Sequence, residues 1–367
     1  MKILHIVSNI SKQNGIMHFI MSYYSKLKDC GVTFDFVYFD ERKDNFEDSI
    51  SSFGGKCFCF PKPKNLFKLR KRIVSFSKEN HGNYDIMHIH DTFMISFFYS
   101  LKKKCGIKKI VCHAHSTRFS DNFLGGIRNR ILSFPNKFLT DYFAACSDDA
   151  GISLFGKHYK KRGFLIKNAL NIENYKFDEN ERRFIRTKYG FDNKTVIGHI
   201  GNFSTPKNHT FLVDVFSHYH ALNSNSVLVL VGDGPLRNSI ESKIRELNLE
   251  SSAYLIGRNN NAKGFLSSFD IFVFPSLFEG LGISFIEAQC NGLPCFVSDA
   301  IPSDANICCL NNEVVPLSST AKEWAAKIFE KSSIRCDDNV NLIKKSGYDI
   351  QSAYLKLLEI YERIIEE

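Results

Sequence analysis

Short apolar runs alternate with longer amphipathic stretches along the first half of the chain. Short apolar runs that end at polar turns are typical of buried strands, and apolar residues at every third or fourth position are typical of helices. The pattern predicts strands at residues 2–7, 33–38, 56–60, 86–90, 109–114, 142–145 and 163–166, with helices that include residues 17–28 and 65–78. Strands and helices in alternation indicate a parallel, doubly wound α/β sheet.

A second series of the same kind fills the second half. Strands are predicted at residues 195–200, 226–231, 253–255, 271–274 and 294–297, with helices at 210–221, 236–247 and 285–291. A chain of 367 residues is long for one core, because soluble domains usually hold about 100–200 residues. We therefore predict two domains, residues 1–168 and 169–349, followed by a last helix at residues 350–367.

The most specific motif lies where the strand at 271–274 runs into the next helix. A Pro-Ser pair ends the strand, so the following residues emerge at the carboxyl edge of the sheet, where open α/β sheets bind ligands. Gly282 allows a backbone path that a larger residue would hinder, and the amides of Ile283 and Ser284 then stand at a helix N-terminus. This arrangement predicts a diphosphate site at these amides.

Two carboxylates flank this turn. Glu279 precedes it on the loop, where its side chain can reach the hydroxyls of a transferred sugar. Glu287 follows it inside the helix, where its carboxylate can accept hydrogen bonds from vicinal hydroxyls such as those of a ribose. A second strand-to-helix turn carries Asn202 and Lys207, which we expect at the same edge, with the lysine ammonium on the diphosphate oxygens.

The first half offers a turn and a group of histidines. The turn between the first strand and the first helix contains Gly15, whose backbone N–H can contact a donor sugar or an acceptor. His88 and His90 share one face of a strand end, as do His113 and His115, because side chains alternate along a strand. Zinc binding is one interpretation, which the lack of a carboxylate or cysteine at suitable spacing disfavours. Buried, hydrogen-bonded histidines are the other.

Charge is spread unevenly. Residues 1–170 hold 28 Lys and Arg against 14 Asp and Glu, a net charge of +14, and residues 171–367 hold 20 against 25, a net charge of −5, which together give +9. Basic clusters at residues 62–72, 102–109 and 157–167 favour contact with an anionic membrane surface, with a solvated face as the alternative. No nucleic-acid-binding motif accompanies the charge.

Cysteine usage indicates the redox state. The chain holds 11 cysteines without a Cys-x-x-Cys pair, and Cys57, Cys59 and Cys112 lie in apolar strand segments. This pattern favours reduced, buried thiols over a disulfide or zinc framework.

Residues 275–294 resemble the Glu-x7-Glu signature of retaining GT-B glycosyltransferases, specifically of glycosyltransferase family 4. The Pro-Ser stop, the Glu-Gly-x-Gly turn, the second glutamate and the closing Gly-x-Pro occur in the family's order, with Leu281 for the usual Phe and Cys295 for the usual Val. The resemblance extends over nearly the whole chain. It implies a GT-B fold, in which two Rossmann-like doubly wound domains face each other across a cleft. The first domain would bind the acceptor and the second the nucleotide sugar, and the last helix would cross back onto the first domain.

The resemblance also implies roles for single residues. Lys207 matches the second cation of a G-R-x-x-x-x-K-G element that offsets charge on the leaving nucleoside diphosphate, whereas Asn202 replaces its arginine. Arg258 follows a strand where the base is contacted largely by the main chain. His115 ends a strand similar to the family's T-x-H element, beside the transferred sugar and its phosphates. Gly15 is the one glycine left of the two adjacent glycines usual in the first turn.

The chain is therefore expected to be a retaining hexosyltransferase of bacterial surface polysaccharide synthesis. It would move a hexosyl unit from a nucleotide sugar to a lipid-linked saccharide, and the expected donor is a UDP-sugar. The departing phosphate would accept the proton of the acceptor. The expected catalytic residues are His115, Lys207 and Glu279, and the expected donor-binding residues are Gly15, Asn202, Lys207, Arg258, Glu279, Gly282, Ile283, Ser284 and Glu287. No metal or other cofactor is expected, because the sequence has no Asp-x-Asp triplet.

Two alternative functions remain open, another enzyme activity and a non-catalytic role. A nucleotide-sugar epimerase or hydrolase could use the same scaffold, and a non-catalytic partner of a glycosyltransferase could keep the fold with Asn202 in place of the arginine. No apolar run is long enough to span a bilayer, and the N-terminal residues form a strand rather than a signal peptide. We expect a cytoplasmic protein associated peripherally with the inner face of the cell membrane, with no nucleic-acid partner.

Overall fold

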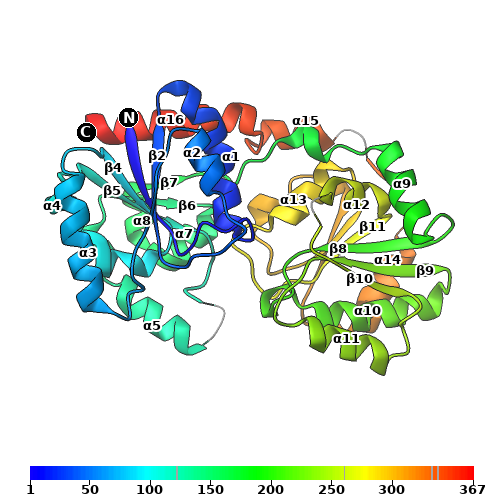
Figure 1. Ribbon diagram of the computed structural model, residues 1–367. Coiled ribbons are helices and arrows are strands. Elements are labelled where there is room, and N and C mark those ends of the chain that lie inside the picture. Colours follow the sequence, from blue (N-terminus) through cyan, green and yellow to red (C-terminus); the bar gives the residue numbers. More distant parts are fainter. Residues whose placement is uncertain (121–122, 260, 332–333, 337–338) are drawn as a thin grey trace. The chain divides into compact units, whose positions relative to one another are not determined.

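The computed structural model describes residues 1–120, 123–259, 261–331, 334–336 and 339–367 (Figure 1). Packing divides the chain into two compact units. The N-terminal unit comprises Met1–Leu170 and Asp349–Glu367, and the C-terminal unit comprises Asn171–Tyr348. Both junctions lie close to the boundaries expected from the sequence, and the last helix packs within the N-terminal unit.

The N-terminal unit is built on a seven-stranded parallel sheet with the order β3-β2-β1-β4-β5-β6-β7. Its strands are β1 (Lys2–Ile6), β2 (Thr33–Tyr38), β3 (Cys57–Cys59), β4 (Ile86–Ile89), β5 (Lys109–Ala114), β6 (Tyr142–Ala145) and β7 (Gly163–Leu165). Its helices are α1 (Gly15–Leu27), α2 (Glu47–Ser52), α3 (Leu66–Glu79), α4 (Ile95–Cys105), α5 (Phe123–Ser133), α6 (Asn136–Leu139), α7 (Asp148–Phe155), α8 (Lys157–Arg162) and α16 (Ile350–Glu366). All seven expected strands are present, some with ends moved by one residue.

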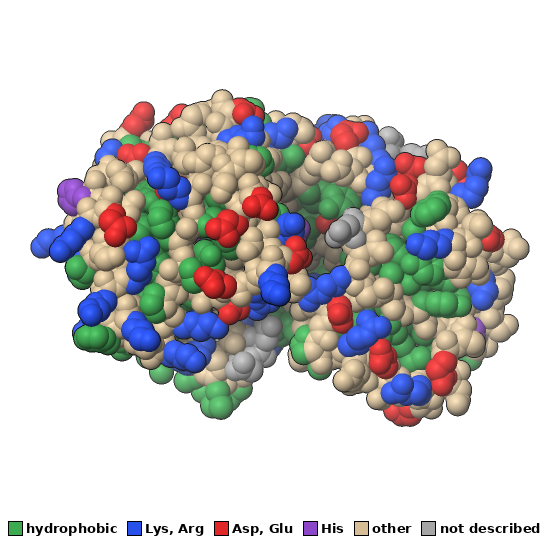
Figure 2. Space-filling view, in the orientation of Figure 1, with side chains coloured by type: hydrophobic (Ala, Val, Ile, Leu, Met, Phe, Trp, Pro, Cys, Tyr) green, Lys and Arg blue, Asp and Glu red, His purple; other side chains and the backbone are tan. Residues whose placement is uncertain are grey.

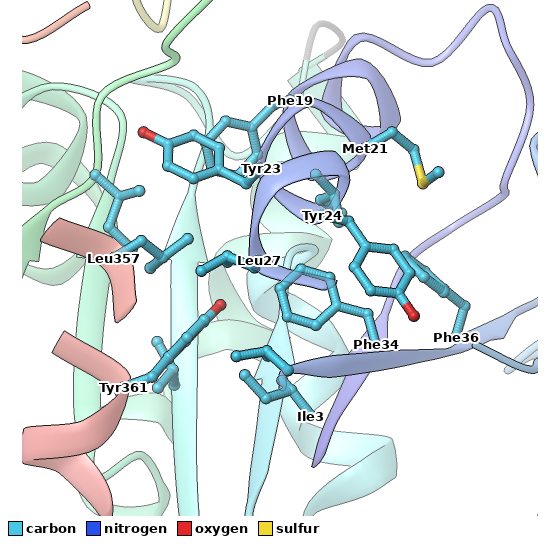
Figure 3. Close-up of a cluster of buried hydrophobic side chains, with 14 of the residues drawn as sticks. Ile3, Phe19, Met21, Tyr23, Tyr24, Leu27, Phe34, Phe36, Leu357 and Tyr361 are labelled. Carbon is cyan, nitrogen blue, oxygen red and sulfur yellow. The ribbon is translucent and has the colours of Figure 1, made fainter. Parts of the chain in front are cut away.

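Helices α1 and α16 pack on one face of this sheet (Figure 3). Leu27 of α1, Phe34 of β2 and Tyr361 of α16 lie in one buried apolar cluster. The buried residues of α16 recur every three or four positions, so one stripe of the helix faces the core and the rest is polar. This apolar stripe explains why α16 packs on the first sheet although the whole C-terminal unit separates it from the other N-terminal elements in sequence.

The C-terminal unit is built on a six-stranded parallel sheet with the order β10-β9-β8-β11-β12-β13. Its strands are β8 (Thr195–Ile200), β9 (Ser226–Val231), β10 (Ala253–Gly257), β11 (Ile271–Phe274), β12 (Cys295–Ser298) and β13 (Asn312–Val315). Its helices are α9 (Glu179–Tyr189), α10 (His209–Leu222), α11 (Arg237–Glu246), α12 (Ala262–Ser268), α13 (Ile283–Cys290), α14 (Ala321–Glu330) and α15 (Asn339–Lys345). The sequence analysis missed β13, because this edge strand is short and begins with two polar residues.

A carboxylate at the start of β11 fixes the strand that leads to the site. Asp270 forms ion pairs with Arg182 (2.5 Å) and Arg186 (3.1 Å) of α9, and it accepts a hydrogen bond from the backbone N–H of Val196 on β8 (2.8 Å). Charge-assisted bonds of this kind are stronger than neutral ones. The contacts tie one covering helix and two central strands together at the opposite end of β11 from the glutamate loop.

Two further expectations concern membrane-spanning segments and cysteines. No helix in the described part of the chain is long and apolar enough to cross a bilayer. The ten cysteines whose side chains are described are free thiols, and Cys112 is buried, but Cys59 is exposed. The prediction of burial was wrong for Cys59 because β3 lies at the edge of its sheet, where less of the chain covers it.

The packing of α16 can be tested with Ile364→Ala. Ile364 is fully buried in the N-terminal unit, so the truncation should lower the free energy of unfolding by roughly 2–5 kcal/mol. Leu355→Ala on the same helix is the matched control, because Leu355 is about half exposed and its loss should change stability by less than about 0.5 kcal/mol. Urea unfolding measures both. Equal effects of the two variants would contradict the assignment of the buried stripe.

Candidate active site

The turn between β11 and α13 requires glycine at position 282. Gly282 adopts a left-handed backbone conformation with φ +88°, which residues with side chains rarely adopt. A Cβ atom there would also lie 3.1 Å from the ring of Phe274. The expected role of Gly282 in the turn is therefore confirmed, for reasons of both backbone conformation and space.

The turn opens directly into α13, whose first residues are Ile283 and Ser284. The first amides of a helix have no acceptor within the helix, and the helix dipole makes this end positive. Gly282 supplies no capping side chain, and the first turn holds no acidic residue. The local structure therefore suits an anion at these amides.

Lys207 and Glu279, which were expected at one site, are in direct contact. Lys207 ends a short 3-10 helix, η4 (Thr205–Lys207), just before α10. Its Nζ lies 2.6 Å from Oε1 of Glu279, and the two side chains are only 18% and 11% exposed. The ammonium also lies 4.8 Å from the centre of the Phe274 ring. The structure thus holds a covered ion pair beside the turn that carries Gly282.

Glu287 on α13 has a different environment. Burial raises the pKa of its carboxyl group to about 7, while a hydrogen bond from the hydroxyl of Tyr175 and the charge of Lys207 act in the opposite direction. Asn291, one turn further along α13, donates a hydrogen bond to the carbonyl oxygen of Tyr175 (2.9 Å). Tyr175 is therefore held to α13 through both its side chain and its main chain.

The sequence analysis missed Tyr175. It ends η3 (Ile172–Tyr175), a short 3-10 helix directly after the junction between the units, and no motif surrounds it. Its contact with Glu287 joins positions that are far apart in sequence, so no local signal marks it.

Three other residues that were expected to bind the donor are exposed. Asn202 is exposed and lies beside Gly234, where an added Cβ would be 2.8 Å from the Asn202 side-chain oxygen. Arg258 is exposed directly after β10. Gly15, the first residue of α1, is exposed, and no other atom would lie within 4 Å of an added Cβ. Packing therefore does not require glycine at position 15.

The four expected histidines lie together in the N-terminal unit. His5, which the sequence analysis missed, lies with them. His5 of β1 hydrogen-bonds to His90 (2.8 Å), and His90 hydrogen-bonds to His115 (2.8 Å). His5 lies opposite His88 in the parallel register of β1 and β4. The strand order was the missing information, because it makes β1 and β4 neighbours although two strands separate them in sequence.

A second pair continues this network. His88 hydrogen-bonds to His113 (3.2 Å) and to the hydroxyl of Tyr361 on α16 (2.7 Å). Burial lowers the pKa of His5 and His115 to about 3, and it lowers the pKa of His88, His90 and His113 well below the usual value. The five imidazoles are therefore neutral near pH 7, a state in which each ring has one donor and one acceptor nitrogen.

The histidines also bear on the zinc alternative. Two sets of three, His5 with His88 and His90, and His90 with His113 and His115, have ligand nitrogens within 4.8 Å of one another. These sets contain only histidine. A metal ion in either set would have to replace a hydrogen bond between rings, because both nitrogens of His90 are already used, Nε2 in the bond to His5 and Nδ1 in the bond to His115.

Two doubly wound parallel sheets, one of which ends in a glycine turn beside a covered Lys-Glu pair, define an α/β protein of the GT-B class. Residues 181–343 match the family model described as "Glycosyl transferases group 1". The chain is 30% identical over 372 residues to the putative glycosyltransferase EpsF of Bacillus subtilis (strain 168), covering 98% of this chain and 96% of the relative. The chain belongs to the glycosyl transferase group 1 family.

The chain is also similar to a second relative and to a solved structure. A protein of Escherichia coli named UDP-Gal:alpha-D-GlcNAc-diphosphoundecaprenol alpha-1,3-galactosyltransferase is 25% identical over 343 residues, covering 87% of this chain and 85% of the relative. The crystal structure of Anabaena Alr3699/HepE in complex with UDP is similar with a TM-score of 0.81 at 17% identity, covering 99% of this chain and 100% of that one. The structural likeness confirms the predicted fold class.

The histidine network predicts acid sensitivity. Unfolding returns the five imidazoles to a pKa near 6.5, so below that pH the unfolded state binds more protons and the free energy of unfolding falls as the pH decreases toward the folded pKa values. The loss approaches about 1.4 kcal/mol per pH unit for each fully shifted histidine. His199 and His209, whose pKa burial lowers to about 3 and about 2, act in the same direction as these five. Asp91 and Glu287, whose pKa burial raises to about 6 and about 7, act in the opposite direction, but they are two groups against seven.

We expect the urea midpoint to be steady between about pH 8 and 7 and to fall steeply between about pH 6 and 5. His218→Gln, at an exposed position, should follow the same curve as the unaltered protein. A midpoint that stays constant down to about pH 5 would show that these imidazoles are not kept neutral by the fold.

Proposed function

We propose that this protein is a retaining glycosyltransferase of family 4 that transfers a hexosyl unit from a UDP-sugar to a lipid-linked saccharide. The observation that carries the proposal is the covered Lys207–Glu279 pair beside the N-terminus of α13. Support also comes from the relatives, since the Escherichia coli protein is named for a UDP-Gal donor and a diphosphoundecaprenol-linked acceptor and the Anabaena protein was crystallised with UDP. We further propose a role in bacterial surface polysaccharide synthesis.

The donor diphosphate would bind across two positive groups. The amides of Ile283 and Ser284 would hold one phosphate, and the ammonium of Lys207 would turn from Glu279 to the phosphate that leaves with the nucleoside. The released Glu279 carboxylate could then accept hydrogen bonds from hydroxyls of the transferred sugar. Donor binding would thus rearrange the ion pair and place both side chains in their working positions.

Transfer itself would depend on positioning and charge stabilisation. The bond from the anomeric carbon to the phosphate oxygen breaks while the acceptor oxygen attacks the same face, and the departing phosphate takes the acceptor's proton. Lys207 and the helix amides would stabilise the charge that grows on that phosphate, and no protein base is needed. Asn202 would donate a hydrogen bond without adding charge.

Further residues are proposed to contact the donor. Glu287 would accept hydrogen bonds from the ribose, and Arg258 would lie near the base. We propose that His115 and Gly15 of the N-terminal unit contact the sugar side. Because burial keeps His115 neutral, it would act as a hydrogen-bonding group and not as a cation. We propose that no metal ion is required, and that the protein associates peripherally with an anionic membrane surface.

The ion pair yields opposite predictions for its two members. Lys207→Ala should weaken UDP binding by roughly tenfold or more and reduce transfer by roughly a hundredfold or more, because the phosphate loses a charged partner. Glu279→Gln should bind UDP at least as tightly as the unaltered protein, because Lys207 loses its competing carboxylate, while transfer falls. Calorimetry with UDP and release of UDP from UDP-sugars, with membrane lipid extract as acceptor, measure the two effects.

Lys322→Ala, an exposed lysine of the same unit, is the matched control and should change neither quantity. One assay arm contains a chelator, in which transfer should persist. Weaker UDP binding in Glu279→Gln would contradict the proposed competition for Lys207. Epimer formation or stoichiometric hydrolysis without acceptor would favour the epimerase or hydrolase alternative, and unchanged transfer in both variants would exclude a catalytic role for the pair.

Tyr175→Phe should make UDP binding depend more strongly on pH. The tyrosine hydroxyl lowers the pKa of Glu287, so its removal should raise that pKa further and leave less carboxylate for the ribose near pH 7. We expect affinity to fall about three- to tenfold at about pH 6.5 and to recover as the pH rises to about 8.5, where the carboxylate is restored. Calorimetry across this range measures the change.

Tyr254→Phe is the control, since that hydroxyl bonds to the carbonyl oxygen of Ser251. With 2′-deoxyuridine diphosphate the extra pH dependence should shrink, because one ribose hydroxyl is missing. An identical pH profile for Tyr175→Phe and the unaltered protein would remove Tyr175 from the account.

A further inference from the structure

Helix α5 exposes its apolar residues and buries its polar ones. Phe123, Leu124 and Ile131 are 81%, 78% and 67% exposed, whereas Asn129 and Ser133 are buried. A helix on the surface of a soluble domain normally has the reverse arrangement. The inward side of α5 therefore does not use apolar burial to hold the helix on the unit.

Hydrogen bonds hold the polar side inward instead. The side-chain amide of Asn129 donates to the carbonyl oxygen of Phe119 (2.8 Å), and the hydroxyl of Ser133 bonds to that of Thr92 (2.9 Å). Asn136, at the start of α6, donates to the carbonyl oxygen of Thr92 (2.8 Å). Rotating α5 to hide its apolar side would break these bonds and bury polar groups without partners. The outward orientation is thus fixed by the structure.

The exposed residues form one stripe. At about 100° per residue, positions 123, 124, 127 and 131 fall within an arc of about 100°, with Arg130 on one side of the arc and Arg128 on the other. The stripe continues to Phe134 and Phe138, whose rings lie 3.6 and 4.8 Å from the Lys137 ammonium. We define the α5 face as the exposed apolar residues Phe123, Leu124, Ile127, Ile131, Phe134 and Phe138.

The surroundings of the α5 face are basic. Residues 1–170 carry a net charge of +14, and no ion pair within the described part of the chain involves Arg128, Arg130 or Lys137. Figure 2 shows hydrophobic side chains with Lys and Arg around them at the lower edge of the N-terminal unit, where Figure 1 places α5. An apolar stripe flanked by cations is the pattern of helices that lie in the interface of an anionic bilayer.

Helix α3, which overlaps the basic cluster at residues 62–72, has a different character. In α3, three of the six apolar residues, Leu69, Ile73 and Phe76, are buried and serve the core of the unit, as in an ordinary covering helix. The other three, Leu66, Phe67 and Val74, are exposed. The sequence analysis favoured membrane contact at the basic clusters, whereas the structure shows an outward apolar stripe at a place that those clusters did not mark.

We propose that the α5 face docks on an anionic lipid bilayer, with its apolar side chains in the interface and Arg128, Arg130 and Lys137 at the headgroups. A second copy of this chain fits less well, because pairing two such faces would bring their cations together. The inference rests on the proposed function in that a lipid-linked acceptor lies in a membrane. Its test measures lipid binding alone, and so it can fail or succeed independently of sugar transfer.

The experiment is co-sedimentation of the full chain with phosphatidylcholine vesicles that contain or lack phosphatidylglycerol. The unaltered protein should bind the anionic vesicles at low salt and bind more weakly at high salt, and it should bind pure phosphatidylcholine poorly. The double variant Phe123→Ser/Leu124→Ser should lose about tenfold or more in vesicle affinity. Phe184→Ser/Leu222→Ser, at exposed apolar positions of the C-terminal unit, is the matched control and should bind as the unaltered protein does.

A reporter variant locates the contact. The chain has one tryptophan, Trp324, which is fully buried in the C-terminal unit. Leu124→Trp should therefore add a fluorescence component that brominated lipid quenches, while Phe184→Trp should not be quenched. Circular dichroism confirms that each variant is folded.

Three outcomes would overturn the proposal. The first is no binding to anionic vesicles at low salt. The second is equal binding by the two double variants. The third is a concentration-dependent dimer in light scattering that the Phe123→Ser/Leu124→Ser change abolishes, without vesicle binding, because the α5 face would then be an interface between copies of this chain.

Discussion

The site depends on a covered ammonium group, that of Lys207, and on the carboxylate that neutralises it. Lys207 is largely removed from solvent, and a charge in such a position is costly unless a partner neutralises it. Glu279 neutralises it in the described state. The first amides of α13 stand at the same turn, where Gly282 supplies no capping side chain. The proposed diphosphate has enough charge and length to meet both the ammonium and these amides.

The two glutamates of the motif are separated in function by their surroundings. Glu279 lies beside a cation, while Glu287 is buried with the Tyr175 hydroxyl, and burial raises its pKa to about 7. A carboxyl group that titrates near neutrality can exchange a tyrosine hydroxyl for a ribose hydroxyl with little change in the number of hydrogen bonds. Tyr175 follows the junction between the units, so the segment after the junction is linked to Glu287 of α13.

The local sequence pattern predicted strands and turns that depend on neighbouring residues along the chain. β2, β5, β8 and β9 have the predicted bounds, because each is a continuous buried run between polar turns. Gly282 was predictable because the turn geometry allows only glycine. His5 and Tyr175 were not, because each meets its partner through tertiary contacts that one sequence does not display. The outward orientation of α5 was not predictable either, because an apolar stripe is normally taken to face the core. Only the hydrogen bonds of Asn129 and Ser133 show that this stripe faces outward.

Two sets of buried polar groups in the N-terminal unit, the histidine network and the support of α5, are connected. Thr92, which anchors both Ser133 and Asn136, lies two residues beyond His90, which holds His5 and His115. The short segment that leaves β4 therefore carries the histidine network on one side and the support of α5 on the other. Hydrogen bonds fix position more strictly than apolar contacts do, because they depend on direction as well as distance. A bilayer that holds the α5 face would in consequence also fix the strand ends that carry His90 and His115. A lipid-linked acceptor and the histidine proposed to contact the sugar would then be positioned by the same few residues.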